Sequence, residues 1–216
     1  MIRTSMPMPN AQRTLVIRRC KLGLMAIQEL RERIIHAADQ LFYARGTSNV
    51  GMDAVRTKAG ASLKAIYKEF SSKEELIVAV LAYRHELWIN GLAEETAGSQ
   101  SARDRVLAIY DYLAKWFAKD DFRGCGFINA FGELGSTSPR VAEAVKLHKK
   151  SFQDYVGQLV VDAGWRAELG AQLAILAEGA QTSAAIAHDP SLAATARGAA
   201  QTLIDAAESD RQAALR

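Results

Sequence analysis

Helical periodicity runs through almost the whole chain after residue 28. Apolar side chains recur there every three to four residues, and no run alternates apolar and polar residues as a half-buried strand would. Gly46, Gly60 and Gly164 are suited to end helices, and Pro139 is suited to a first helical turn. The sequence therefore predicts an all-α protein, with helices at about 31–43, 52–59, 62–70, 72–95, 102–118, 127–134, 139–162, 168–187 and 191–207.

Length and composition fit an ordinary globular protein. The chain has 216 residues, of which 49% are hydrophobic and 24% charged, enough to bury a sizeable core. No stretch reaches the roughly 18 to 20 uncharged apolar residues that would cross a bilayer. Two cysteines, Cys20 and Cys125, cannot form a disulfide framework, which indicates a reducing environment. We expect a cytoplasmic protein with no membrane partner.

Charge is unevenly distributed along the chain. Residues 1–28 carry five basic side chains and no acid, whereas residues 81–216 carry fourteen basic and seventeen acidic ones. The basic extension has three interpretations: residues before an internal start at Met25, a flexible arm that touches nucleic acid, or a targeting segment. We divide the chain into this extension (1–28), a helix-turn-helix domain (29–76, with the motif at about 51–70) and a helical domain (77–216).

The cluster of short helices from Met52 to Phe70 carries the most specific signal. Two helices of seven to nine residues, joined at Gly60-Ala61, have the size of a helix-turn-helix whose second helix enters a major groove. Ile66 and Phe70 are expected to point inward. A plain three-helix pack with solvated lysines would give the same spacing. The face expected to be exposed on the second helix consists of Ser62, Leu63, Lys64, Ala65, Tyr67 and Lys68.

Several short motifs follow one another between about residues 33 and 76. They are Ala59-Gly60-Ala61-Ser62, then Ile66-Tyr67 and Phe70, then Ser72-Lys73-Glu74 and Leu76, preceded by Arg33-Ile34, Ala37-Ala38, Phe42 and Gly46. In this respect the chain resembles the TetR family of dimeric bacterial transcription regulators. The resemblance is strong over about residues 29–90 and continues more weakly, in register, to about 150, where Arg123-Gly124-Cys125 and Phe127-Ile128-Asn129-Ala130 look like a motif of one subgroup.

The resemblance implies roles for individual residues. Tyr67 and Lys73 match residues that hold DNA phosphates, and reading of bases falls to Ser62, Leu63, Lys64 and Lys68. There are departures as well. Where this chain has Gly51 and Ala65, the family usually has hydroxyl side chains, and where it has Lys64, a small residue. Where it has Glu69, the family usually has histidine or an aromatic residue, and we expect the Glu69 carboxylate to repel the DNA backbone.

A pocket for a small-molecule effector of unknown identity is implied by the family and shown by no motif. The alternative is that most of the aromatic residues in the carboxy-terminal helices pack in the core, as large aromatic side chains usually do. Cys125 is either a thiol sensor or a small buried residue, the second being favoured. The four histidines are too dispersed for metal ligands, so we expect no metal, no cofactor and no catalysis. The candidate lining is Trp88, Tyr110, Trp116, Phe127, Asn129, Phe131, Glu133, His148, Phe152 and Tyr155.

The last two helices carry stripes of leucine and alanine. In the family these helices pair with their twofold mates, although a helix hairpin within one chain would give the same stripes. We therefore expect a homodimeric, ligand-responsive repressor that binds a palindromic double-stranded DNA operator. The alternatives are a helical protein that binds a ligand or partner and has lost DNA binding, and an enzyme. The stripes are Leu169, Leu173, Leu176, Ala177, Ala180, Ala184 and Ala187, then Leu192, Ala196, Ala199, Leu203 and Ala206.

Overall fold

The computed structural model of the chain describes residues 10–214, with side chains from residue 27 to 213. Within this part every regular element is a helix, which confirms the all-α prediction. The helices are α1 (Asn10–Arg45), α2 (Met52–Ala59), α3 (Leu63–Glu69), α4 (Lys73–Ala97), α5 (Ala102–Phe117), α6 (Gly126–Leu134), α7 (Pro139–Asp162), α8 (Glu168–Ala187) and α9 (Leu192–Ala214).

The start of α1 differs from the sequence prediction. The helix begins at Asn10, well before Arg31. Pro9 precedes it, and no proline interrupts residues 10–45, so the single Gly23 in between is not enough to end the helix. Residues 1–9 lie outside the described part, and the three interpretations of the basic extension remain predictions.

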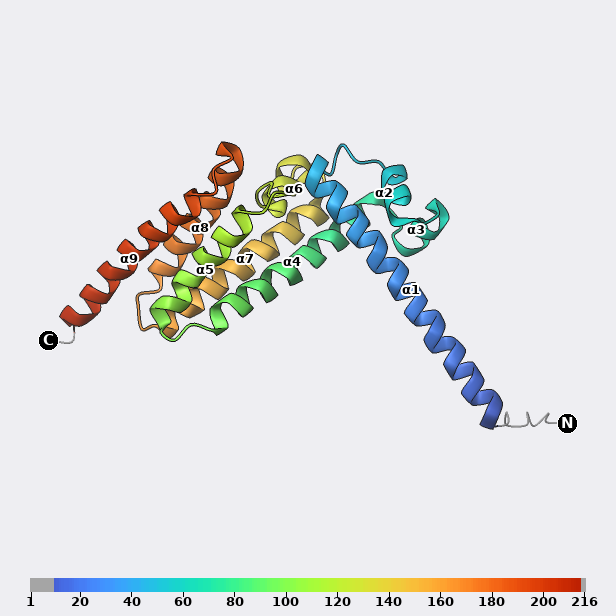
Figure 1. The fold of residues 1–216 in the computed structure, drawn as a ribbon, viewed down its shortest axis with the longest axis horizontal. Helices are drawn as coiled ribbons and strands as arrows, with labels where there is room; N and C mark the ends of the chain where they lie inside the picture. Colours follow the sequence, from blue (N-terminus) through green and yellow to red (C-terminus); the bar gives the residue numbers. More distant parts are fainter. Residues whose placement is uncertain (1–9, 215–216) are drawn as a thin grey trace.

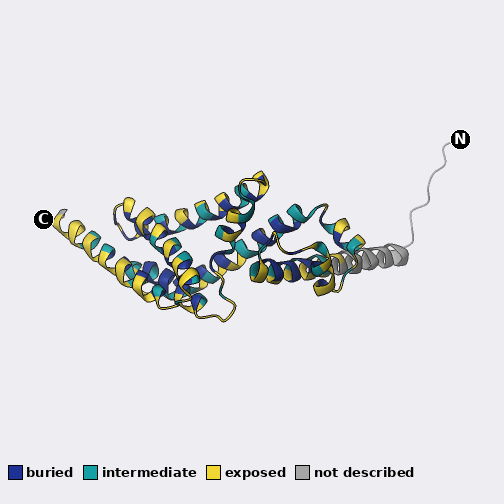
Figure 2. Ribbon diagram, turned by 90° about the horizontal axis from the view of Figure 1, so that it is seen from above, coloured by how far each residue is buried: buried dark blue, intermediate teal, exposed yellow. Residues whose placement is uncertain are grey.

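Two clusters of buried side chains form the core. The amino-terminal cluster joins α1, α2 and α3 to the first half of α4, and also takes in Phe127 of α6 and Val141 of α7. The carboxy-terminal cluster joins the second half of α4 to α5, α7, α8 and α9. In Figure 1, α6 lies between these two groups of helices, and in Figure 2 the buried residues follow their inner faces.

Helix α4 belongs to both clusters. Leu76 and Val80 pack in the amino-terminal cluster, whereas Trp88 and Leu92, further along the helix, pack in the carboxy-terminal one. The domain boundary predicted at residue 76 therefore falls near the start of a continuous helix. Because packed helices move as stiff units, a displacement of α4 in one cluster also displaces the α4 residues that pack in the other cluster.

Candidate nucleic-acid interface and ligand cavity

The turn between α2 and α3 closes on Gly60. This residue has a left-handed backbone (φ 61°), and a Cβ added there would meet no atom within 4 Å. The backbone conformation, and not a lack of space, therefore requires glycine. The Gly60 amide donates to the Thr57 carbonyl (3.4 Å) and the Ala61 amide to the Arg56 carbonyl (3.2 Å). These bonds end α2 and set the direction in which α3 starts.

Ser62 begins α3. Its hydroxyl accepts a hydrogen bond from the Ala65 amide at 3.1 Å, a side-chain cap of the helix. Ile66 and Phe70 are fully buried in the amino-terminal cluster, as predicted. Their burial fixes which face of the short helix turns outward.

The outward face of α3 is polar and basic. Tyr67 is 48% exposed, and within the described residues neither Lys64 nor Lys68 forms an ion pair. Their two charges are therefore available to an anionic partner such as DNA phosphate. Of the six residues predicted to be exposed, Ser62, Lys64, Tyr67 and Lys68 are exposed, and Leu63 and Ala65 are half-buried.

The side chain of Glu69, which was expected to repel DNA, is mostly buried beside Arg31. The Arg31 guanidinium of α1 donates to the Glu69 carbonyl (3.0 Å), lies 4.0 Å from its carboxylate and covers the Phe70 ring at 4.3 Å. Only 14% of the Glu69 side chain is exposed. The nearby guanidinium offsets much of its charge, so the expected repulsion is reduced.

The start of α4 is capped from two directions. The Ser72 hydroxyl accepts from the Glu75 amide (3.1 Å), and the Glu75 carboxylate accepts from the amide and hydroxyl of Ser71 (2.8 and 2.6 Å). The two contacts form a variant of the capping box, in which the returning bond from Glu75 ends at Ser71, one residue before the cap. Lys73 lies in this first turn, where burial lowers its pKa and the charge of Glu133 partly offsets that effect.

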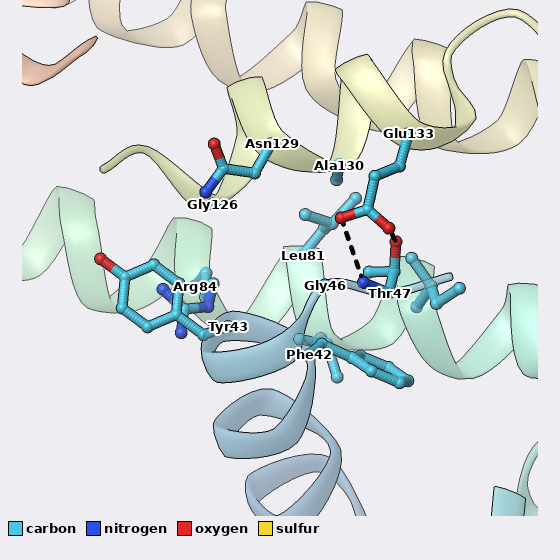
Figure 3. A pocket seen from close by; sticks show the side chains of 12 residues that line it. Phe42, Tyr43, Gly46, Thr47, Leu81, Arg84, Gly126, Asn129, Ala130 and Glu133 are labelled. Carbon is cyan, nitrogen blue, oxygen red and sulfur yellow. Dashed lines mark hydrogen bonds between the residues drawn. The ribbon is translucent and has the colours of Figure 1, made fainter. Parts of the chain in front are cut away.

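Three hydrogen bonds to Glu133 connect α6 to the loop between α1 and α2. The Glu133 carboxylate accepts from the Thr47 amide (3.2 Å), the Thr47 hydroxyl (2.7 Å) and the Ser48 amide (2.6 Å). Figure 3 shows Glu133 and Thr47 on one side of a cavity of about 130 Å³, and Arg84 and Tyr43 on the other. This places Glu133, a predicted ligand residue, in contact with the predicted helix-turn-helix domain.

A second set of contacts connects α1 to α4 and to the segment before α6. The Tyr43 hydroxyl donates to the Gly124 carbonyl and accepts from the Arg123 amide, both at 2.9 Å. Arg84 of α4 forms an ion pair with Asp39 of α1 and covers the Tyr43 ring at 3.9 Å. Helices α1, α4 and the segment before α6 are thus fixed to one another by polar contacts.

Replacing Glu133 by glutamine should lower the free energy of unfolding by about 1 kcal/mol at neutral pH, because charge-assisted hydrogen bonds weaken. Burial raises the pKa of Glu133, but the hydrogen bonds from Ser48 and Thr47 outweigh it and hold the pKa below the ordinary 4.5. A carboxylate with a lowered pKa stabilises the fold above its ordinary pKa, and the contribution disappears as pH falls through the lowered value.

Urea unfolding at neutral pH and below pH 4 measures this difference. Glu143→Gln is the matched control, since Glu143 is an exposed carboxylate on α7. The difference between wild type and Glu133→Gln should be present at neutral pH and shrink in acid. An effect no larger than that of the control, or one independent of pH, would contradict the role given to Glu133.

The predicted ligand residues do not form one site. Tyr110 is buried in the core and donates to the Leu173 carbonyl (2.8 Å), and burial raises its pKa well above the ordinary value. Phe152 packs edge-on to Trp88, with ring centroids 5.8 Å apart. Tyr155 pairs with the Thr96 hydroxyl. The positions outside the cavity described next are Tyr110, Asn129, Phe131, Glu133, Phe152 and Tyr155.

Four of the predicted residues line a common cavity of about 160 Å³ between α4, α5, α6, α7 and α8: Trp88, Trp116, Phe127 and His148. The sequence analysis missed Tyr112 and Gln181, which line it as well. Tyr112 stands one helical turn before Trp116 on α5, a spacing that could have identified it. Gln181 on α8 is far from the others in sequence and gave no local signal.

The structure brings together two histidines that looked dispersed. His85 of α4 and His148 of α7 have their Nδ1 atoms 3.0 Å apart, and His148 stacks on Phe127 with ring centroids 3.5 Å apart. Burial, with the charges of Lys149 and His85, lowers the pKa of His148 to about 3. His148 is therefore neutral at physiological pH, and one ring nitrogen of the pair donates to the other. Among the described residues no group of three or more potential ligands could hold a metal ion.

Cys125 lies directly before α6. It is buried in the amino-terminal cluster, as favoured from the sequence, and the Lys149 ammonium is 3.6 Å from its sulfur. The Arg123 guanidinium, two residues before Cys125, donates to the carbonyls of Asp120 and Phe122. The role of a thiol sensor remains a prediction.

The stripes on the last two helices divide between two faces. Most of the predicted α8 stripe, including Leu173 and Ala177, is buried inside the chain. Beside it lies an exposed apolar groove between α8 and α9, and Ile175 on this face is 68% exposed. The residues lining the groove are Gln172, Ile175, Leu176, Ala199, Thr202 and Leu203.

The chain is similar in sequence to known proteins. A sequence model of the bacterial regulatory proteins of the tetR family matches residues 34–80. The chain is 31% identical over 152 residues to the HTH-type transcriptional activator FasR of Mycolicibacterium smegmatis, an alignment covering 68% of this chain and 66% of that protein. It is 44% identical over 142 residues to the HTH-type transcriptional regulator SrpR of Pseudomonas putida, covering 66% and 64%. The chain belongs to the TetR family.

The overall fold is that of the TetR family as well. The crystal structure of a TetR-family regulator from Streptomyces coelicolor superposes with a TM-score of 0.76 at 27% identity, covering 83% of this chain and 96% of that one. The relatives are transcriptional regulators and not enzymes, which confirms the prediction that this chain is not an enzyme. The alignments span just under two thirds of FasR and SrpR. No helix among the described residues has the length and apolar character needed to cross a membrane.

Proposed function

We propose that this TetR-family chain is a ligand-responsive transcriptional repressor that binds a palindromic DNA operator as a homodimer. The outward face of α3 is the observation that carries the proposal. Its lysines and tyrosine project from a short helix whose other face is locked by Ile66 and Phe70. A short, rigid, basic helix of this kind fits a major groove.

The exposed groove on α8 and α9 supports the homodimer. An apolar face of this kind on a regulator is suited to pairing with the same face of a second copy. Ile175 and Ile186 are the two most exposed large apolar side chains among the described residues. Pairing through α8 and α9 would present two α3 helices to successive major grooves.

The continuity of α4 supports the response to a ligand. Trp88, on the second half of α4, lines the cavity of about 160 Å³ between α4, α5, α6, α7 and α8, while the first half of the helix packs in the DNA-binding domain. A ligand that binds one position of α4 better than another shifts the population toward that position. The spacing of the two α3 helices in the dimer would change with it, and DNA would be released.

Selection of genomic fragments by the purified full chain tests the DNA-binding function. We expect enrichment of one palindrome whose half-sites lie about one helical turn apart, and reduced transcription from promoters that contain it. Recovery of no enriched sequence would contradict the proposal. It would favour a helical ligand- or partner-binding protein that has lost DNA binding, an alternative motivated by Gly51, which caps α2 without a side chain.

A further inference from the structure

The cavity wall holds one buried polar side chain, Trp88, that lacks a hydrogen-bond partner among the described residues, and a second polar side chain, Gln181. Trp88 is 9% exposed, and its indole nitrogen has no acceptor among the described residues. Gln181 is 2% exposed, and its amide forms no hydrogen bond within the described part of the chain. A buried donor without an acceptor is costly, so the Trp88 indole indicates a ligand that brings an acceptor atom, and the Gln181 amide can donate to the same ligand.

The volume of the cavity suits one aromatic ring. Its volume of about 160 Å³ is close to the roughly 150 Å³ of an apolar cavity that takes up benzene. Tyr112 and Trp116 stand edge-on to Trp88, with ring centroids 5.1 and 5.3 Å away. The stacked pair of Phe127 and His148 lines the same cavity. Flat walls of this kind favour a planar ring.

The charges at the cavity favour an anion over a cation. Its lining includes Arg84 and Lys119 and no aspartate or glutamate. Arg84 is already paired with Asp39, whereas Lys119 is exposed and forms no ion pair within the described residues. A cationic ligand would find no carboxylate among the lining residues, and Glu178, one turn before Gln181 on α8, is paired with Lys149, so a negatively charged acceptor group suits the site better.

We propose that the effector is a single-ring aromatic carboxylate, whose ring lies against Trp88 and Phe127 and whose carboxylate accepts from the Trp88 indole and the Gln181 amide. This inference rests on the proposed function, in which the cavity is the effector site. A carboxylate that accepts from buried donors forms charge-assisted hydrogen bonds, and its charge is further favoured by Lys119.

A series of small probes tests the chemical class on the full chain. Benzoate, benzamide, benzylammonium and cyclohexanecarboxylate share one size but differ in charge or planarity. Titration followed by tryptophan fluorescence, in the Trp165→Phe background, reports on Trp88 and Trp116. We expect saturable quenching by benzoate, weaker binding of benzamide and cyclohexanecarboxylate, and none of benzylammonium. Benzylammonium or benzamide binding as tightly as benzoate, or no saturable change with benzoate, would overturn the proposal.

A matched pair of variants tests the contact with Trp88. Trp88→Phe keeps an aromatic ring and removes the N–H group, and calorimetry should show benzoate binding weakened roughly ten- to a hundredfold. Trp165→Phe makes the same change at a buried site outside the cavity and should leave the affinity unchanged. Equal affinities of the two variants would contradict the contact. The probe series on wild type stays decisive if Trp88→Phe does not fold.

DNA binding is measured in the same samples without benzoate. Benzoate binding by a chain that selects no DNA site would leave the cavity assignment standing and reject the regulatory function. Specific DNA binding by a chain that does not bind benzoate would do the reverse.

Discussion

The double variant Tyr67→Ala/Lys73→Ala should bind the selected operator roughly ten- to a thousandfold more weakly than wild type near physiological salt, with a similar loss on unrelated DNA. The reason is that the family resemblance assigns both side chains to phosphates, which carry no sequence information. Tyr67 is exposed on α3, and Lys73 lies in the first turn of α4, where the helix amino end already favours an anion.

The salt dependence separates the two contributions. Loss of the Lys73 ammonium should reduce the slope of log affinity against log salt by about one, whereas loss of the uncharged Tyr67 hydroxyl should change it little. Lys146→Ala removes one exposed lysine from α7 and controls for bulk charge. A folded double variant with wild-type affinity and slope would refute the assignment.

Replacement of Ile175 by glutamate should raise the dimer dissociation constant by roughly a hundredfold or more. Ile175 is a large apolar side chain, exposed in the single chain, on the groove between α8 and α9. In a twofold interface each substitution occurs twice, so two carboxylates would lose their water without a partner, and apolar burial would be lost on both sides. Operator affinity should fall with it, because a monomer presents only one α3 helix.

Sedimentation of wild type and variant over a range of concentrations measures the dissociation constant. Val161→Glu is the matched control: Val161 is an exposed aliphatic residue on α7 that does not line the groove. The control should remain dimeric. A dimer of unchanged affinity in Ile175→Glu would show that α8 and α9 do not pair through this face.

Features set by neighbouring residues were predictable from the sequence. Ser62, Ser72 and Ser138 each cap a helix through an amide three residues later, and Pro139 marked the first turn of α7 in the sequence. The predicted starts of α3, α4 and α7 lie within one residue of the observed ones. The inward direction of Ile66 and Phe70 follows from helical spacing alone. The outward face of α3 was therefore largely predictable.

Features set by distant parts of the chain were not. Glu133 was assigned to a ligand pocket. The residues that donate hydrogen bonds to it, Thr47 and Ser48, lie in the loop between α1 and α2, too far away in sequence to be recognised from a local pattern. His85 and His148 meet only once α4 packs against α7. The stripe of leucines and alanines on α8 was expected to pair with a twofold mate or to pack in a helix hairpin, and most of it packs within the chain. Helical periodicity could not decide between the two, because it identifies an apolar face but not its partner.

The effect of half-site spacing on DNA binding tests the central claim most directly. The claim is that two α3 helices, held at a fixed separation by the α8–α9 dimer, read successive major grooves. Inserting about five base pairs between the half-sites of the selected operator turns one of them to the opposite side of the duplex. We predict that the full chain then binds no more tightly than it binds a single half-site. Affinity that does not depend on the spacing would contradict the account.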